Sequence, residues 1–512
     1  MILENGLIRT LDPSLPTARA LAIAGDRIVG GVGVHEWALP TPERVDLRGR
    51  CVVPGFVDSH VHFLSWSLAQ TMLRLDDCAD LREITARVAR AAQHLKPGEW
   101  LVGRGWREGD WPEEQSAHRD HLDGVSTENP VALVARDGHS LWLNSAAIAD
   151  AESEISRIGD VVERSMDGAP TGVLREQAAW TFRERFIQFP ESQMREAMRQ
   201  GLRLANARGV TAIHDQDGSR GILPHWQGLK ESRLLSARVW QSLPISDLEE
   251  LASLGLRSGF GDDLLRLGHL KVFMDGALAS GTANLIDAGG VELTSRTELE
   301  ELARSAASAG WPLSIHAIGD QANRDALDAL EATQDAWRPA GLRPRIEHAQ
   351  LLHPADIPRF AELDVACSVQ FSHAPSDQVI ADAQWTERLD GAYAYGSLAA
   401  SGALLANGSD APVEELDPLA GIYAGSTRTL DERPPWRASE ALTAFQALQA
   451  TTSAPAWLEH AERTRGHLTP GALADLVVLS GDPLESGPNI APVEVVATML
   501  GGRWVHQPPP WD

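Results

Sequence analysis

The stretch GFVDSHVHF, residues 55–63, decides both the fold and the chemistry expected of this chain. Because side chains alternate along a strand, His60 and His62 point to the same face. At the C-terminal end of a barrel strand, that face opens on the active site. Two neighbouring imidazoles chelate zinc or a similar ion. A His-x-His pair alone is weak evidence, because two surface histidines give the same pattern.

Seven further strand-like runs follow, and amphipathic helical stretches such as ELEELARSAASAG separate several of them. The runs are VTAIHDQ, ARVWQSL, HLKVFMDG, LSIHAIGD, RIEHAQ, ACSVQFSH and ALLANGSD. This alternation predicts βα units and a parallel sheet. Eight strands are the number of a (β/α)8 TIM-type barrel. A doubly wound open sheet is the alternative, but no GxGxxG follows an early strand.

The expected organisation is α/β, with the barrel between residues 53 and 464. Residues 1–52 and 465–512 read as short strands and turns and predict one small β-sandwich built from both termini. Residues 64 to about 205 separate the first two barrel strands, which is too long for a simple crossover. We therefore expect a large, tryptophan-rich inserted subdomain there.

Three more candidate ligands stand near the ends of predicted strands: His316 in LSIHAIGD, His348 in RIEHAQ and Asp410 in ALLANGSD. The C-terminal ends of the strands of a barrel meet around one mouth. If the barrel is correct, these three residues converge with the His-x-His pair. One strand-terminal histidine is usually an ordinary core or surface residue, whereas the whole set points to a metal centre.

Lysine occurs at only three positions, Lys96, Lys230 and Lys271, beside 42 arginines. Lys271 lies early in the apolar run HLKVFMDG, where a bare ammonium is costly to bury. It is either paired with a carboxylate such as Asp275 or Asp410, or carbamylated by CO2 into a carboxylate that bridges two cations. The scarcity of lysine favours the carbamylated form.

This set of residues resembles the amidohydrolase superfamily, and more narrowly its YtcJ-like branch (amidohydrolase family 3), which includes N-substituted formamide deformylases. The resemblance runs from the start of the chain to near residue 483. It is carried by the stretches VVPGFVDSHVHF, GRGWREGDWP, DGHSLWLNSAAI, PTGVLREQA, KVFMDGALAS, IHAIGDQAN, RIEHAQ, SVQFSHAPSD, GSDAPVEELDPLAG and GHLTPGALADLVVLSGDP.

The resemblance implies a role for each candidate. His60 and His62 would bind the more buried metal, and Lys271 as carboxylysine would bridge to a second metal. The second metal would be held by His316 and His348. Asp410 would contact the metal and accept the proton of the nucleophilic water. A bound dication lowers the pKa of water to near 7 and polarises the scissile carbonyl, which agrees with these roles.

The number of metal ions is open, because some family members use one metal and the lysine need not be carboxylated. Glu176 is a second carboxylate that could reach the site from the insertion, or a glutamate at a helix N-terminus. His139 is a candidate substrate contact if the insertion covers the barrel mouth. Trp106 belongs to an apolar pocket wall or, more simply, to the packing of the inserted subdomain.

His214, His269 and His373 also lie near predicted strands, and we expect ordinary or supporting roles, with His214 and His373 as further pocket candidates. The chain departs from its relatives at Gly281, where they carry Arg, and at Phe371, where they often carry Pro. Both positions are expected on loops at the C-terminal side of the barrel. The departures leave the substrate open and the metal chemistry intact.

The net charge of −26 comes from 45 basic and 71 acidic residues. Because phosphate backbones need clustered Lys and Arg, nucleic acid is not expected as a partner. Cys51, Cys78 and Cys367 are widely spaced and contain no CxxC pair, so a reducing cytoplasm fits best. No secretory signal pattern and no long apolar run is visible, so no membrane association is expected.

The function predicted is hydrolysis of a C–N bond in an amide or cyclic amide, by a water activated on a divalent metal, most simply zinc, with Asp410 as general base. The rivals are hydrolysis of an ester, lactone or phosphoester at the same site, and a lyase or isomerase reaction through an enolate. A catalytically silent scaffold is disfavoured because all six ligand positions are filled. The partner expected is a small molecule, and a homodimer is a guess from the resemblance.

Overall fold

A parallel barrel forms the centre of the molecule in the computed structural model, which describes residues 1–31, 43–112, 115–149, 162–165, 168–217, 222–485 and 492–511. All eight predicted barrel strands are confirmed, and each hydrogen-bonds in parallel to the next. They are β6 (Phe56–Val61), β13 (Val210–Asp215), β14 (Arg238–Pro244), β15 (Leu265–Phe273), β16 (Leu313–Ala317), β17 (Arg345–His348), β18 (Ala366–Val369) and β19 (Leu405–Asn407).

The first and last strands approach each other and bring the barrel close to closure. The backbone N–H of Asp410 donates to His60 O at 2.7 Å, and that of His62 donates to Ala411 O at 2.9 Å. A Cβ on Gly408 would lie 2.3 Å from the backbone nitrogen of His60, so only glycine allows this approach. The seam of the barrel is therefore where two candidate ligands are fixed against each other.

Helices surround the barrel and bury apolar side chains. Helix α9 (Arg296–Ser308) begins at Ser295, whose side chain accepts from the Glu298 N–H, and it buries Leu299 and Ala303. The others are α6 (Glu191–Ala207), α7 (Ile222–Glu231), α8 (Leu248–Ser253), α10 (Asp320–Ala332), α11 (Gln334–Trp337), α12 (Ile357–Glu362), α13 (His373–Gln384), α14 (Tyr395–Ser401), α15 (Pro418–Thr427), α16 (Ala444–Ala450) and α17 (Ser453–Leu458).

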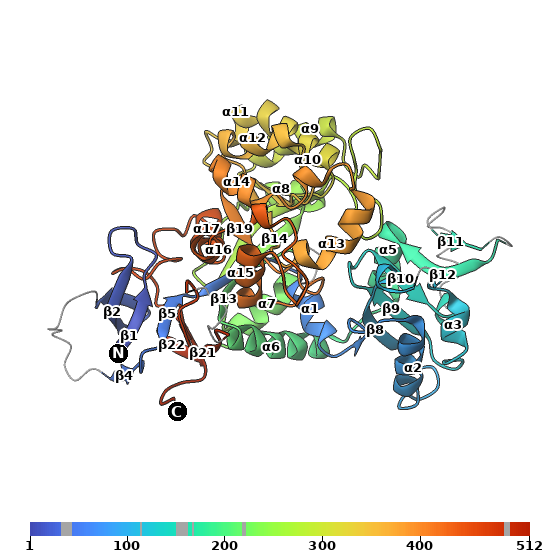
Figure 1. Ribbon diagram of the computed structural model, residues 1–512, viewed down its shortest axis with the longest axis horizontal. Coiled ribbons are helices and arrows are strands. Elements are labelled where there is room, and N and C mark those ends of the chain that lie inside the picture. The colour runs from blue at the N-terminus through green and yellow to red at the C-terminus, as the bar shows by residue number, and fades with distance from the viewer. Residues whose placement is uncertain are drawn as a thin grey trace.

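The long segment after the first barrel strand carries its own six-stranded sheet, which lies to the right of the barrel in Figure 1. We call residues 73–186 the cap. Its strands, in spatial order, are β11 (Val162–Arg164), β12 (Pro170–Arg175), β10 (Ser140–Leu143), β9 (Val131–Ala135), β8 (Leu101–Trp106) and β7 (Leu73–Arg74). Its helices include α2 (Leu81–Ala92), α3 (Arg119–Asp123) and α5 (Glu176–Phe186), and α1 (Phe63–Ala69) leads into it.

Strands from both ends of the chain form one sheet, at the left of Figure 1. Its order is β22 (Arg503–His506), β21 (Val495–Leu500), β20 (Leu476–Leu479), β5 (Cys51–Pro54), β1 (Ile2–Arg9), β2 (Thr17–Ala24) and β3 (Arg27–Gly30), with β4 (Arg44–Asp46) beside β1. The two ends meet where β5 pairs antiparallel with β20. A sandwich of two facing sheets stays a prediction, as do the predicted domain boundaries.

One strand begins earlier than the sequence indicated. The apolar run was expected to start at His269, which placed Lys271 early in its strand, whereas β15 begins at Leu265. Lys271 is therefore near the C-terminal end of β15. This correction moves the lysine to the same end of the barrel as the other candidate ligands.

None of the described helices is both long and apolar enough to cross a lipid bilayer. The three cysteines are all buried and free of disulfides. A cytoplasmic location stays a prediction.

Candidate metal centre

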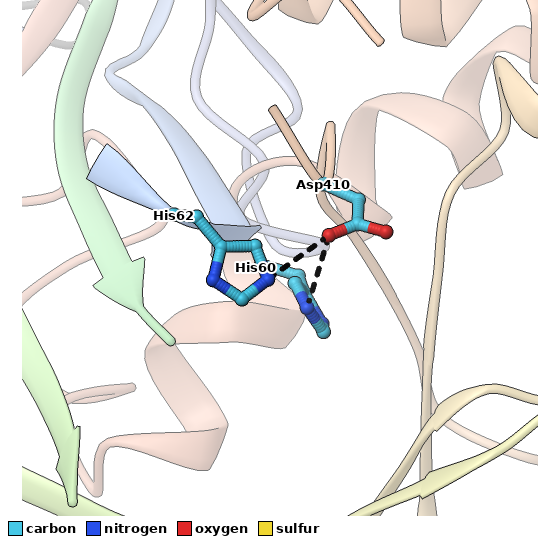
Figure 2. A group of neighbouring side chains, drawn as sticks. All are labelled: His60, His62 and Asp410. Carbon is cyan, nitrogen blue, oxygen red and sulfur yellow. Dashed lines mark ion pairs between the residues drawn. The ribbon is translucent and has the colours of Figure 1, made fainter. Parts of the chain in front are cut away.

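Two imidazoles and a carboxylate meet at the seam of the barrel (Figure 2). His60 lies in β6 and His62 directly follows it, while Asp410 follows β19. The Nε2 atoms of the two histidines lie 3.3 Å and 3.4 Å from the same Oδ1 of Asp410. Two ring nitrogens and a carboxylate oxygen aimed at one point are a ligand set for zinc.

The other two predicted histidines lie beside this group. The ring centroid of His348, at the end of β17, is 4.8 Å from that of His60 and 4.6 Å from that of His316. His348 Nδ1 is 3.9 Å from Asp410 Oδ2. The structure thus brings together all four histidines and the aspartate that were selected from the sequence.

Each of the four imidazoles has one nitrogen engaged by an outer partner. The contacts are His60 Nδ1 with Glu347 Oε2 at 2.7 Å, His62 Nδ1 with Asp217 Oδ1 at 3.2 Å, His348 Nδ1 with Gln370 Oε1 at 2.9 Å, and His316 Nε2 with Gly276 O at 3.0 Å. Such partners fix the ring orientation and tautomer of metal-binding histidines. The second nitrogen remains for a ligand, and His60 Nε2 is buried with no hydrogen-bond partner among the described residues. These donors fit a divalent cation.

Protonation states favour the same use at two of the histidines. Burial lowers the pKa of His60 to about 4 and that of His316 to about 3, so both are neutral, as a metal ligand must be. At His62 burial lowers the pKa, but Asp217 and Asp410 outweigh burial and raise it to about 10, so His62 must lose a proton when it binds a metal. Burial alone would raise the pKa of Asp410, but neighbouring His60 and His62 hold it well below its usual range. Asp410 is therefore ionised at neutral pH.

Lys271 is buried near the centre without a carboxylate partner. Its side chain makes no ion pair or hydrogen bond with any described residue, and Nζ lies 5.1 Å from the centroid of the Phe273 ring. Asp275, one suggested partner, instead accepts from the backbone N–H groups of Ile318 and Gly319 at 3.0 Å and 2.8 Å. Burial lowers the pKa of Lys271 to about 8.

Two of the candidate ligands have a strained backbone. His348 has φ of 73° and Asp410 has φ of 55°, in the left-handed region that non-glycine residues seldom adopt. Each such residue costs about 1–3 kcal/mol and persists where surrounding structure enforces it, typically at functional sites.

A family model described as the amidohydrolase family matches residues 43–506 of the chain. The chain belongs to the amidohydrolase family. This confirms the resemblance inferred from the motifs and supports hydrolase activity dependent on a divalent metal.

Relatives of this amidohydrolase match along nearly the whole chain. Protein LONG AFTER FAR-RED 3 of Arabidopsis thaliana is 32% identical, over 99% of this chain and 91% of its own length. Putative amidohydrolase YtcJ of Bacillus subtilis is 28% identical, over 94% and 95%. N-substituted formamide deformylase of Arthrobacter pascens is 26% identical, over 98% and 97%.

A solved structure has the same fold. The crystal structure of an uncharacterized metal-dependent hydrolase from Pyrococcus horikoshii OT3 superposes with a TM-score of 0.77 at 26% identity, covering 95% of this chain and 98% of that one.

His373 joins the site of this amidohydrolase more closely than its sequence indicated. It begins α13, and its Nε2 lies 4.0 Å from Asp410 Oδ2, buried and without a hydrogen bond among the described residues. His348, His373 and Asp410 form a second group whose ligand atoms are close enough to share an ion. In the sequence, the signal that could have indicated this role of His373 is its position in SVQFSH, just after β18.

His214 and His269 are structural. His214 Nε2 contacts Glu459 at 2.9 Å and its Nδ1 contacts Arg345 at 2.9 Å. His269 accepts from Trp240 Nε1 at 2.9 Å. No described contact joins either ring to Asp410, and a pocket role for His214 stays a prediction.

The predicted substrate contacts occupy the junction of cap and barrel. The His139 ring centroid is 6.3 Å from that of His316. Trp106 is almost fully buried against Trp111 and Trp142, as packing predicts, yet its edge also lines a cleft described below. Glu176 begins α5, and its side chain lies outside the described part of the structure.

The two departures from the relatives differ in their surroundings. Phe371 is fully buried and packs against Tyr395, with ring centroids 5.3 Å apart, so it belongs to the core rather than to a specificity loop. Gly281 has φ of 67° and no atom within 4 Å of where a Cβ would lie. Of these two positions, only Gly281 therefore has open space where a side chain would lie.

A small cleft, partly open to solvent, lies between the cap and the barrel mouth. Its charged lining comes from both sides: Arg107, Glu108, Arg136, Asp137 and Arg175 from the cap, and Asp377 and Glu414 from the barrel. Arg107 pairs with Asp377 at 2.9 Å and Arg136 with Glu414 at 2.8 Å. The cleft lies beside the loop that carries Asp410.

Proposed function

We propose that this amidohydrolase hydrolyses a C–N bond in an amide or cyclic amide of a small molecule, with a divalent metal as cofactor and Asp410 as general base. The convergence of Asp410 with His60 and His62 at 3.3–3.4 Å carries the proposal. The likeness to a formamide deformylase supports the choice of bond.

The donors of this centre fit zinc, because imidazole nitrogens and a carboxylate are its preferred ligands outside thiolate sites. His60, His62 and Asp410 would hold one ion, and His316 and His348 would hold a second. When bound, the cation supplies the Lewis acidity that activates water and polarises the substrate carbonyl.

The proton transfers belong to Asp410. Its carboxylate takes a proton from the attacking water as the water oxygen bonds to the carbonyl carbon. The carboxyl then gives that proton to the leaving nitrogen as the C–N bond breaks. An acid and an amine leave, and Asp410 is again ionised.

Lys271 would complete a two-metal site as a carbamate. Its amine attacks CO2, an N–C bond forms, and one proton is lost, leaving a carboxylate. The proposal is supported by the burial of Lys271 without a carboxylate partner and by its place on β15, next to the strand that carries His316. We expect Lys271→Ala to lower metal content at least several-fold, with partial recovery on adding acetate or propionate, measured by elemental analysis. Unaltered metal content would instead favour a single-metal site, or Glu176 as the bridging carboxylate.

The experiment that tests the function combines metal analysis with a substrate panel. We expect purified protein to contain stoichiometric divalent metal and to hydrolyse members of an N-acyl and cyclic-imide panel. His60→Ala should lose both, whereas His121→Ala, an exposed cap histidine, should lose neither. Esters, lactones and phosphoesters are assayed beside this panel. If they are hydrolysed faster than the amides, the proposal of a C–N bond as the substrate bond is wrong. Absence of both metal and turnover would indicate a silent scaffold.

A further inference from the structure

The cap covers one side of the barrel mouth through α5 and the turn between β9 and β10. The Trp180 ring in α5 is 6.1 Å from the Phe273 ring at the end of β15. It is also 5.3 Å from the His139 ring, which itself neighbours His316. A substrate bound at the metal centre would thus lie beneath this part of the cap.

Arg183 lies one helical turn after Trp180, on the same face of α5. Both side chains donate to the same carbonyl, Gly138 O, with Arg183 Nη1 at 3.1 Å and Trp180 Nε1 at 3.3 Å. The guanidinium and the indole therefore converge on Gly138, the residue before His139. Arg183 is partly buried rather than exposed at the surface.

The rest of the Arg183 guanidinium has no partner among the described residues. A guanidinium carries five N–H donors, and the Gly138 bond uses one of them. No described carboxylate lies within ion-pair distance of Arg183. The nearby arginines of the cleft differ, since Arg107 and Arg136 are each paired with a barrel carboxylate.

Two acidic residues mark where this cation lies. Asp217 and Asp137 are the charged groups that act on Arg183, while burial lowers its pKa. Asp217 binds His62 Nδ1, and Asp137 lines the cleft. Arg183 is therefore within electrostatic range of a residue of the metal centre and of a residue of the cleft. A partly buried cation with no described carboxylate at ion-pair distance is stabilised when a ligand supplies one.

We propose that Arg183 binds a carboxylate of the substrate, so that the substrates are amides that carry a free carboxylate, such as N-acyl amino acids. This inference rests on the proposed function and specifies its substrate class. The planar guanidinium offers two parallel N–H donors to a carboxylate, a geometry that a lysine or a neutral amide cannot match. The acyl C–N bond would then lie toward Asp410, with the carboxylate held beneath the cap.

The test compares pairs of substrates that differ only in charge. N-formyl and N-acetyl amino acids are assayed beside their C-terminal amides, with wild type, Arg183→Gln and Arg183→Lys. The wild type should prefer the free acids by at least 10-fold in kcat/KM. Arg183→Gln should raise KM for the acids about 10- to 100-fold, the usual loss when a charged hydrogen-bond partner is removed. It should leave the amides within twofold.

Arg185→Gln is the matched control, because it removes an exposed arginine two residues along the same helix. It should leave the acid preference unchanged. Thermal unfolding of each variant shows that the fold is kept. An unchanged acid-to-amide ratio in Arg183→Gln overturns the proposal. Equal losses in kcat on acids and amides also overturn it, and would assign Arg183 to the reacting carbonyl.

Failure of the proposed function can be separated from failure of this inference. If no amide is hydrolysed, calorimetric titration with N-acetyl-L-alanine still measures recognition. Tighter binding of the acid than of N-acetyl-L-alanine amide, lost in Arg183→Gln, supports a carboxylate site even without turnover. Equal binding of acid and amide, or no binding of either by the wild type, overturns it.

Discussion

Asp410 combines two properties that rarely coincide in one residue. Its carboxylate is within 3.4 Å of two imidazoles, and its backbone is held in a left-handed conformation by a hydrogen bond to His60 O. The hydrogen bond fixes the main chain of Asp410 against that of His60. A residue so placed can serve as ligand and proton acceptor in the same cycle.

Replacing Asp410 by Asn should separate its role as metal ligand from its role as proton acceptor. The amide keeps the size and one ligand oxygen but accepts no proton at neutral pH. We expect metal content within about twofold of wild type and a fall in kcat of about 10²–10⁴, the range for loss of a general base. Steady-state kinetics on metal-quantified protein measures this. More than a few per cent of wild-type kcat would assign the proton transfer to another group.

Glu347 was not recognised as functional from its sequence, although it precedes a predicted ligand. It is fully buried, bonds to Ser314 Oγ, and lies 2.6 Å from Arg345 Nε. These neighbours fix the carboxylate that in turn fixes His60. A rigid outer partner of this kind keeps the His60 tautomer with Nε2 available.

We predict that Glu347→Gln weakens metal binding by about 10- to 100-fold, because outer partners of metal-binding histidines contribute to affinity on that scale. Competition with a chromophoric chelator gives the dissociation constant without requiring turnover. Glu301→Gln, on the exposed face of α9, is the control and should bind metal like wild type. Equal dissociation constants for the two variants would remove Glu347 from this role.

At the scale of elements, the eight barrel strands could be predicted because each has an apolar run of the right length. The start of β15 could not, because Arg266 interrupts its apolar pattern. In the folded chain Arg266 pairs with Glu459 at 3.2 Å and lies 5.2 Å from the Trp240 ring centroid, so its charge is compensated inside the strand. In the sequence, an arginine inside an apolar run indicates the end of a strand, because its partners lie far away along the chain.

The ligands could be predicted from strand ends, whereas their outer partners depend on which strands lie side by side. Glu347 pairs with His316 across two neighbouring strands, yet its carboxylate reaches His60 in a third. Asp217 and Gln370 come from two further segments. Such contacts depend on strand register and side-chain direction, which motifs do not encode.

The elements of the cap are joined to the loop after Asp410 by the Arg136–Glu414 ion pair, which is mostly buried. We expect Glu414→Gln to loosen this edge of the cleft and to lower kcat/KM about 3- to 10-fold, mainly through KM. High salt should narrow the difference, because screening weakens the wild-type pair. Rates at low and high ionic strength measure both effects.

A surface pair supplies the comparison. Asp364→Asn breaks the exposed Arg338–Asp364 pair at 2.8 Å, far from the cap in sequence, and should change neither constant. If Glu414→Gln behaves in the same way, the ion pair contributes nothing to substrate binding.

The whole molecule depends on the joint between the barrel and the terminal sheet. Arg238, at the start of β14, pairs with Asp475 through two hydrogen bonds of 2.6 Å and 2.9 Å, both side chains being nearly buried. The Asp475 carbonyl also accepts from Gly55 N at 3.0 Å, at the entry to β6. This pair therefore holds the terminal sheet against the base of the strand that carries His60.

Removing one partner of a buried pair leaves an uncompensated charge, so Asp475→Ala should lower the free energy of unfolding by about 3–5 kcal/mol. Urea denaturation followed by far-ultraviolet circular dichroism measures the change. The double variant Arg238→Met with Asp475→Leu should recover most of the loss, since no charge is left alone. A single variant as stable as wild type would mean that solvent reaches Arg238.

The whole chain is acidic, with a net charge of −26. That nucleic acid is not a partner stays a prediction from this charge. A single cation such as Arg183 contributes more to anion binding in so acidic a protein, because the other charges of the protein repel anions. Assembly as a homodimer stays a prediction.

The pairing of β5 with β20 has a consequence for how the protein is made. Leu476 leaves the ribosome roughly 425 residues after Cys51, a delay of about 20–85 s at ordinary rates of translation. Throughout that interval the edge of β5 that pairs with β20 is unpaired, and unpaired strand edges promote aggregation. We expect a chaperone requirement during synthesis that ends when the last strands emerge.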